Sequence, residues 1–151
     1  MKIELLAVGR LRKGPELDLI EDYRKRLGWP FTLTELESKH KDEARMHAEE
    51  LVLLKARLAP TSFVVALDER GKTMASRELA GLFSDLQVQN RAQVQFVIGG
   101  ANGLDDELRK RADLLLSFGR LTWPHMLARV MLLEQIYRCQ QIQKNHPYHR
   151  D

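Results

Sequence analysis

The chain has 151 residues, 44% of them hydrophobic and 30% charged, with a formal net charge of +3 and a pI of about 9.1. These values predict a single globular domain over residues 1–151, whose mildly basic charge is compatible with a nucleic-acid partner. The single Cys139 excludes an internal disulfide and a cysteine-rich zinc site; the apolar runs are too short to cross a membrane and no signal-peptide pattern occurs, so we expect a cytoplasmic protein.

Apolar runs and amphipathic helical patterns alternate along the chain. In chain order they predict a strand at Ile3–Val8, a helix at Pro15–Leu27, a strand at Phe31–Leu36, a helix from Asp42 to about Leu58, a strand at Phe63–Leu67, a helix from Ser76 through Leu86, a strand at Val94–Ile98, a helix from Asp105 to about Ala112, a strand at Leu114–Ser117 and a helix from Pro124 to about Gln143. Asp42, Ser76 and Asp105 are each placed to cap a helix. This βαβαβαβαβα order predicts an α/β domain with a mostly parallel sheet flanked by helices.

Three segments that follow predicted strands carry unusual residues. Gly99–Gly103 is rich in glycine, which lets the backbone approach a ligand closely but is also typical of a plain tight turn. Phe118–His125 is a loop in which Trp123 can either form the wall of a site for a flat heterocycle or pack on the core. Asp68–Lys72 is typical of an exposed turn. Ligands of open α/β sheets bind beyond the carboxyl ends of the strands, so these loops are the candidate binding region.

The C-terminal segment Asn145–Asp151 (NHPYHRD) concentrates groups that can transfer protons or grip phosphate. A solvated polar tail is the alternative, but the helical pattern that leads into the segment favours a position against a surface. His146 and His149 have no carboxylate or cysteine at ligand spacing, so we expect no metal site. No P-loop and no Gly-x-Ser-x-Gly motif occurs, which argues against ATP or GTP hydrolysis and against a serine hydrolase.

Taken in order, several motifs resemble the RlmH (YbeA) family. They are Ala7-Val8-Gly9-Arg10, Leu67-Asp68 with Gly71-Lys72, Phe96–Gly103, Leu116-Ser117-Phe118, Leu121–His125, Arg129-Val130 with Glu134-Gln135 and Tyr137-Arg138, and Asn145–Arg150. The resemblance covers the whole chain. It implies a SPOUT methyltransferase with a C-terminal trefoil knot, which is a rare exception to unknotted topology. It also implies a homodimer that methylates N3 of a pseudouridine in 23S (large-subunit) rRNA on assembled ribosomes, with S-adenosylmethionine (SAM) as methyl donor.

The resemblance also assigns site residues. The implied SAM contacts are Leu67, Gly100, Gly119, Arg120, Leu121, Thr122, Trp123 and Pro124. The implied catalytic and RNA-binding tail residues are Tyr148, His149 and Arg150, with His125 as an alternative base or a structural residue at the helix start. Basic residues expected to contact RNA phosphate are Arg10, Arg129 and Arg138, although charge runs are commonly only solvated helix faces.

The chemistry of the reaction suggests roles for the tail. The imide nitrogen of pseudouridine must lose a proton, which places negative charge on the flanking carbonyl oxygens. His149 is able to take that proton, Arg150 to hold phosphate or a carbonyl, and Tyr148 to stack on the base or donate a hydrogen bond. A non-catalytic ribosome-associated RNA-binding protein is the alternative function, and a small-molecule nucleotide enzyme unconnected to RNA is a third.

Overall fold

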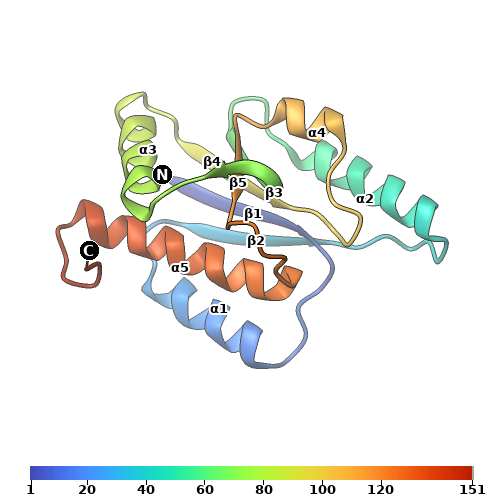
Figure 1. Cartoon of the computed structure of the whole chain (residues 1–151), viewed down its shortest axis with the longest axis horizontal. Helices are drawn as coiled ribbons and strands as arrows, with labels where there is room; N and C mark the ends of the chain where they lie inside the picture. Colours follow the sequence, from blue (N-terminus) through green and yellow to red (C-terminus); the bar gives the residue numbers. More distant parts are fainter. Residues whose placement is uncertain (151) are drawn as a thin grey trace.

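The computed structural model describes residues 1–150, in which five strands and five helices alternate (Figure 1). The elements are β1 (Lys2–Val8), α1 (Pro15–Arg26), β2 (Phe31–Leu36), α2 (Glu43–Arg57), β3 (Phe63–Thr73), α3 (Ser76–Val88), β4 (Gln93–Ile98), α4 (Asp106–Arg111), β5 (Leu114–Ser117) and α5 (His125–Gln143). The strands form one sheet in the order β2-β1-β4-β3-β5, and every pair is parallel. The predicted α/β class, the element order and the parallel sheet are therefore confirmed.

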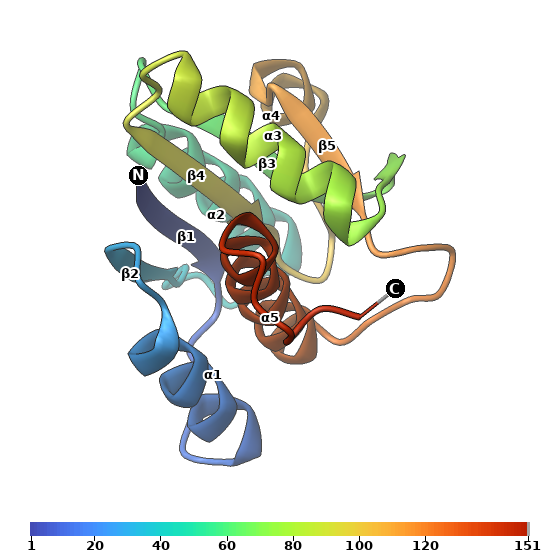
Figure 2. The same cartoon turned by 90° about the vertical axis from the view of Figure 1, so that its left-hand side faces the viewer.

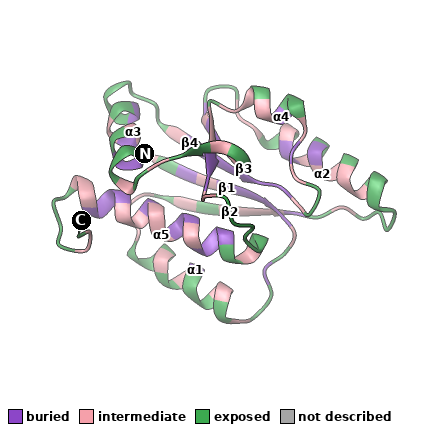
Figure 3. Cartoon of the chain, in the orientation of Figure 1, coloured by how far each residue is buried: buried purple, intermediate pink, exposed green. Residues whose placement is uncertain are grey.

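Helices cover both faces of the sheet (Figure 2). Successive residues of a strand point to opposite faces, so Leu5 of β1 packs in the core shared with α1, α3 and α5, whereas Leu6 packs in the core shared with α2 and α4. Figure 3 shows the buried residues concentrated in the central strands and on the inner side of α5. The central strands read as continuous apolar runs because both of their faces are buried.

Two of the three predicted helix caps are observed. The Asp42 carboxylate accepts a hydrogen bond from the Arg45 backbone N–H at 3.0 Å, and the Asp105 carboxylate accepts one from Leu108 N–H at 2.8 Å. The prediction for Ser76 was wrong, because Ser76 is the first residue of α3 and its hydroxyl donates to Gln135 Oε1 of α5 at 2.7 Å. Glu78 closes this helix end instead, accepting from the Ala75 N–H at 2.7 Å.

The third strand is longer than predicted. Asp68–Lys72, expected as an exposed turn, continues β3 as far as Thr73, and Lys72 and Thr73 pair with Leu116 and Ser117 of β5 after an irregularity in the register. A Cβ atom at Gly71 would lie 2.6 Å from the backbone carbon of Leu115, so only glycine allows the two strands to approach this closely. The extension carries Asp68 along the carboxyl edge of the sheet. The trefoil knot implied by the resemblance stays a prediction.

Candidate active site

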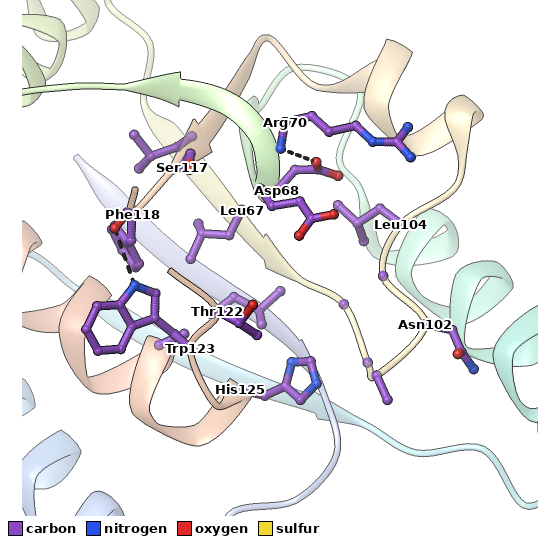
Figure 4. Close-up of a pocket in the computed structure, with 18 of the residues that line it drawn as sticks. Leu67, Asp68, Arg70, Asn102, Leu104, Ser117, Phe118, Thr122, Trp123 and His125 are labelled. Atoms are coloured by element: carbon purple, nitrogen blue, oxygen red, sulfur yellow. Dashed lines mark hydrogen bonds between the residues drawn. The ribbon is translucent and has the colours of Figure 1, made fainter. Parts of the chain in front are cut away.

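A cavity of about 380 Å³ lies at the carboxyl edge of the sheet (Figure 4). It is lined by the second half of β3 and by the residues at and beyond the ends of β4 and β5, so the three segments singled out from the sequence meet in one place. The lining residues are Leu67, Asp68, Glu69, Arg70, Ile98, Gly99, Gly100, Ala101, Asn102, Gly103, Leu104, Arg109, Leu116, Ser117, Phe118, Gly119, Leu121, Thr122, Trp123, His125 and Ala128. This volume lies within the range of roughly 300–1,000 Å³ that is usual for small-molecule sites.

The glycine loop after β4 packs closely against Glu50 of α2 and Val8 of β1. A Cβ at Gly100 would lie 2.8 Å from Glu50 Oε2 of α2 and 3.1 Å from Val8 Cγ1, although Gly100 itself has no positive φ. Gly103 does have a positive φ of 72°, which an L side chain rarely adopts. The loop therefore needs glycine at these two positions for different reasons. Burial of the Glu50 side chain against this loop raises the pKa of its carboxyl group.

The loop between β5 and α5 forms another wall. The Ser117 hydroxyl accepts from Gly119 N–H at 3.2 Å, and Gly119 has a φ of 102°. The Trp123 indole N–H donates to the Phe118 carbonyl oxygen at 3.3 Å, which fixes the ring on the loop (Figure 4). Trp123 stays 37% exposed and lines the cavity, so it is not the core residue that the alternative interpretation expected.

Two of the residues implied as SAM contacts do not line the cavity. Arg120 is exposed, and Pro124 caps the start of α5, where its carbonyl oxygen accepts from Ala128 N–H at 2.9 Å. The remaining implied contacts lie in the cavity wall: Leu67, Gly100, Gly119, Leu121, Thr122 and Trp123.

An ion pair in the wall was missed by the sequence reasoning. Asp68 Oδ2 accepts from Arg109 Nε at 2.8 Å, and only 5% of the Asp68 side chain is exposed. Asp68 Oδ1 also accepts from the Arg70 N–H at 2.8 Å (Figure 4). The hydrogen bond to Asp68 raises the pKa of Arg109, so this pair is a fixed, charged feature of the wall. In the sequence Asp68 is hidden in a charged run that is typical of a solvated turn.

The predicted catalytic residues fall into two places. His125 is the first residue of α5, is exposed and lines the cavity. Tyr148, His149 and Arg150 do not line it, and the C-terminal tail lies at the other end of α5 (Figure 1). His149 contacts Arg138, 13 residues after His125, which corresponds to about 20 Å along a helix axis. One chain therefore does not bring its tail to its own cavity.

The tail is packed on α5 rather than free in solvent. The Tyr148 hydroxyl donates to Glu134 Oε1 at 3.0 Å, and its ring meets the Tyr137 ring edge-on, with centroids 4.9 Å apart. Burial, followed by hydrogen bonding to Tyr23 and Glu134, raises the pKa of Tyr148 well above its ordinary value. Tyr148 is therefore a neutral donor that anchors the tail to the helix.

Arg138 also holds the tail. Its guanidinium donates to Glu134 Oε1 through Nε at 2.9 Å and through Nη2 at 2.5 Å, and its Nη1 lies 3.2 Å from His149 Nδ1. A guanidinium has no acceptor, so Nδ1 of His149 is the acceptor in this hydrogen bond. Arg138, predicted as a phosphate contact, thus has its donors engaged with Glu134 and the tail.

The position of Arg129 contradicts the prediction that this residue contacts RNA phosphate. Its side chain is 0% exposed, and it donates to the Val8 and Gly9 carbonyl oxygens at 2.6 and 2.9 Å and to Glu35 at 3.1 Å. Burial lowers the pKa of its guanidinium, and the Glu35 carboxylate opposes that shift. Arg129 therefore fixes the end of β1 from inside the protein and cannot contact phosphate. Arg10, in contrast, has a side chain 72% exposed and 4.0 Å from Glu37.

Residues 1–150 are the part of the chain that the structure describes. No helix there is both long enough and apolar enough to span a bilayer. The same residues contain no group of three or more histidine, cysteine or acidic side chains arranged to hold a metal ion.

The fold places the chain in a known structural class. A probable methyltransferase from Bordetella pertussis superposes with a TM-score of 0.61 at 15% identity, covering 91% of this chain and 95% of the other. A putative methyltransferase from Legionella pneumophila, solved with bound SAM, superposes with a TM-score of 0.52 at 17% identity, covering 91% of this chain and 66% of the other. At such identities the likeness concerns the fold alone.

Sequence relatives place the chain more narrowly. The family model described as "Predicted SPOUT methyltransferase" matches residues 1–149. The protein named ribosomal RNA large subunit methyltransferase H of Rhodospirillum centenum is 54% identical over 99% of both chains, and that of Zymomonas mobilis is 43% identical over 100% of this chain and 99% of its own. The chain is a SPOUT methyltransferase and belongs to the family of ribosomal RNA large subunit methyltransferases H, as the sequence motifs indicated.

Proposed function

We propose that this chain methylates N3 of a pseudouridine in large-subunit (23S) rRNA within assembled ribosomes, with SAM as the methyl donor. The observation that carries the proposal is the convergence of the second half of β3 and the loops after β4 and β5 on one cavity, in a chain whose relatives are named for methylation of large-subunit rRNA. The SAM-bound neighbour from Legionella pneumophila, with the same fold, supports the choice of cofactor.

The cavity fits a nucleoside cofactor. Apolar side chains, notably Leu67, Leu116 and Trp123, share its walls with polar groups, and the loop containing Gly100 has backbone that can hydrogen-bond to polar edges. A Cβ at Gly103 or Gly119 would meet no atom within 4 Å, so open space lies beside both loops. We assign the adenine wall to Leu121, Thr122 and Trp123, and close backbone contact to Gly100 and Gly119.

SAM supplies an electrophilic methyl group, and the residues of this chain must orient the base and manage its N3 proton. Arg138 holds His149 through its Nδ1, and we assign His149 to stabilise the negative charge that develops on a carbonyl oxygen of the base. His125 is exposed and lines the cavity, so we assign it to accept the proton, directly or through water. The exposed Arg150 is assigned to phosphate.

The tail then serves the cavity of a second copy. A further cavity of about 560 Å³ adjoins the first through Leu116–Gly119 and is lined by Leu19, Met131 and Glu134, among others. Leu19 is 45% exposed there, and Leu121 and Leu127 are 72% and 37% exposed on the adjoining loop and first turn of α5. Exposed apolar residues beside a cavity are typical of a protein interface, which supports a homodimer.

The direct experiment is methyl transfer from labelled SAM to ribosomes that lack the modification, followed by mass spectrometry of the rRNA. We expect one methyl group on a pseudouridine in assembled ribosomes and none on free nucleotides. A non-catalytic RNA-binding protein would bind ribosomes without binding SAM in calorimetry. A small-molecule enzyme would methylate the free nucleotide, and either result would overturn the proposal.

A mixed dimer tests the exchange of tails. One chain lacks residues 148–151 and keeps its cavity, while the other keeps its tail and carries Gly100→Val, which drives a side chain into Glu50 and Val8. If the tail works across the interface, the intact cavity meets the intact tail and about half of the wild-type activity returns, because one of two sites is whole. If the tail serves its own chain, no site is complete and a mixed dimer of verified composition stays inactive.

A further inference from the structure

The tail is held by a cluster that the catalytic proposal does not use. Arg26, in the last turn of α1, lies with its guanidinium carbon 4.4 Å from the Tyr137 ring centroid, 5.2 Å from that of Tyr23 and 5.7 Å from that of Tyr148. These rings belong to α5, α1 and the tail, and all three lie within the roughly 6 Å over which a cation is attracted to an aromatic face. We call Tyr23, Arg26 and Tyr137 the tail clamp.

The backbone alone does not fix the tail. The helix-type hydrogen bonds that continue α5 end at His146, whose N–H donates to Gln141 O at 2.9 Å. Asn145 has a φ of 54°, which reverses the chain direction at the end of α5. Pro147 follows two residues later and prevents the helix from continuing. Tyr148 is the residue that brings the reversed chain back onto the helices, and its ring inserts at the edge of Tyr137, close to Arg26.

The clamp also links the tail to the first helix. Arg26 is oriented by an ion pair with Asp22 at 3.2 Å, and its hydrogen bond with Tyr137 raises the pKa of the guanidinium, so the cation persists at every working pH. Tyr23 and Tyr137 pack with ring centroids 6.0 Å apart, which keeps α1 and α5 in contact at this point. The Arg138 guanidinium carbon also lies 4.9 Å from the Tyr148 ring centroid. Two guanidinium groups therefore lie close to the Tyr148 ring.

We infer that the tail clamp positions the C-terminal tail for methyl transfer, with Arg26 as its central positioning residue. The inference rests on the proposed function, because it assumes that the tail completes an active site. The clamp makes no contact with the cofactor cavity, since Tyr23, Arg26 and Tyr137 are absent from its lining. Its loss should therefore change the orientation of His149 and Arg150 without changing SAM binding.

Arg26→Ala tests this inference in the full-length chain, with Arg24→Ala as the matched control. Arg24 lies on the same turn and pairs with Glu21 at 3.4 Å, with its side chain 49% exposed. We expect Arg26→Ala to lower kcat roughly three- to tenfold with an unchanged Kd for SAM, and Arg26→Lys to restore part of the loss because it keeps the charge but not the planar stacking. Arg24→Ala should match wild type.

A second readout reports the tail without activity. A nitroxide on a cysteine introduced by Arg150→Cys should show a restricted spectrum that shifts toward fast motion when Arg26→Ala is added; the buried Cys139 does not compete for the label. An Arg26→Ala spectrum identical to that of Arg24→Ala, or an equal fall in SAM affinity and kcat, would overturn the inference. Failure of the premise that the tail completes an active site is seen separately, as full methyl transfer by a chain that lacks residues 148–151. Failure of the proposed function is seen as no methyl transfer to ribosomes by the wild-type chain.

Discussion

Replacing Arg129 by alanine tests whether its guanidinium stabilises the fold through buried hydrogen bonds or contacts RNA phosphate. The structure gives this guanidinium three acceptors, the carbonyl oxygens of Val8 and Gly9 and the Glu35 carboxylate, inside a side-chain environment with 0% exposure. Arg129→Ala leaves two buried carbonyl groups and one carboxylate without this partner. Removing one member of a buried ion pair costs about 3–5 kcal/mol.

The expected loss lies at the lower end of that range. Glu35 keeps 24% exposure and also accepts from Leu11 N–H, so water and the backbone compensate part of the lost interaction. We expect the free energy of unfolding to fall by about 3 kcal/mol. With a urea m-value of roughly 1.5–2 kcal/mol/M for a chain of this size, the midpoint moves down by about 1.5–2 M.

The assay is urea unfolding at a fixed chain concentration, because the proposed homodimer would make the apparent stability concentration-dependent. Arg10→Ala is the control: its side chain is 72% exposed, and its stability change should stay within about 0.5 kcal/mol while its ribosome affinity falls. A loss of less than about 1 kcal/mol in Arg129→Ala, together with weaker ribosome binding, would refute the internal role and restore the phosphate contact.

Three further predictions use other parts of the structure. Gly100→Val should abolish SAM binding in calorimetry with the fold retained, since its Cβ would lie 2.8 Å from Glu50 Oε2 and 3.1 Å from Val8 Cγ1 and its two further methyl groups need more room still. Gly81→Ala in α3, where no atom lies within 4 Å, should stabilise by about 0.5–1 kcal/mol without affecting SAM; equal SAM affinity in both variants would contradict the first. Ribosome binding should weaken steeply between low and high salt while SAM binding changes little, and parallel salt slopes would argue against a phosphate-based interface. Burial raises the pKa of the Cys139 thiol to about 12 from an ordinary 9.0, so thiol reagents should not label the native protein at pH 8, and rapid labelling would show that the site opens. The contribution of the buried thiol to the free energy of unfolding should be complete below pH 9 and be lost as the pH rises toward 12, because only the unfolded thiol ionises in that interval.

Much of the fold follows from local rules that the sequence displays directly. The alternation of apolar runs with helical patterns predicted all ten elements in order, and parallel pairing then requires every strand to end at the same edge of the sheet. That is why loops 30 and more residues apart, such as those at Asp68 and Gly100, were expected at one edge before their contact was seen. The extension of β3 was not expected, because its charged residues lack strand periodicity and the close approach at Gly71 depends on β5.

Long-range polar contacts were beyond the reach of sequence patterns. Arg129 and Glu35 are 94 residues apart, and nothing local distinguishes a buried arginine from a solvated one on an amphipathic helix. The pairing of Asp68 with Arg109 across 41 residues was concealed in the same way by two charged runs. In both cases burial of the ion pair depends on tertiary packing. Charge alone therefore predicted exposed side chains, whereas the structure has them in ion pairs with little exposure.

The rigidity of α5 decides how an active site can be assembled. This helix has 19 residues and is about 29 Å long, with His125 at the cavity and the tail packed against its distal half. Bringing Tyr148 to its own cavity would require breaking its hydrogen bond to Glu134 and the Tyr137 contact, and would still leave the helix between the two groups. A second copy of the chain meets the same requirement with both helices intact. The packing that separates the tail from the cavity within one chain is therefore itself an argument that catalysis needs two copies of the chain.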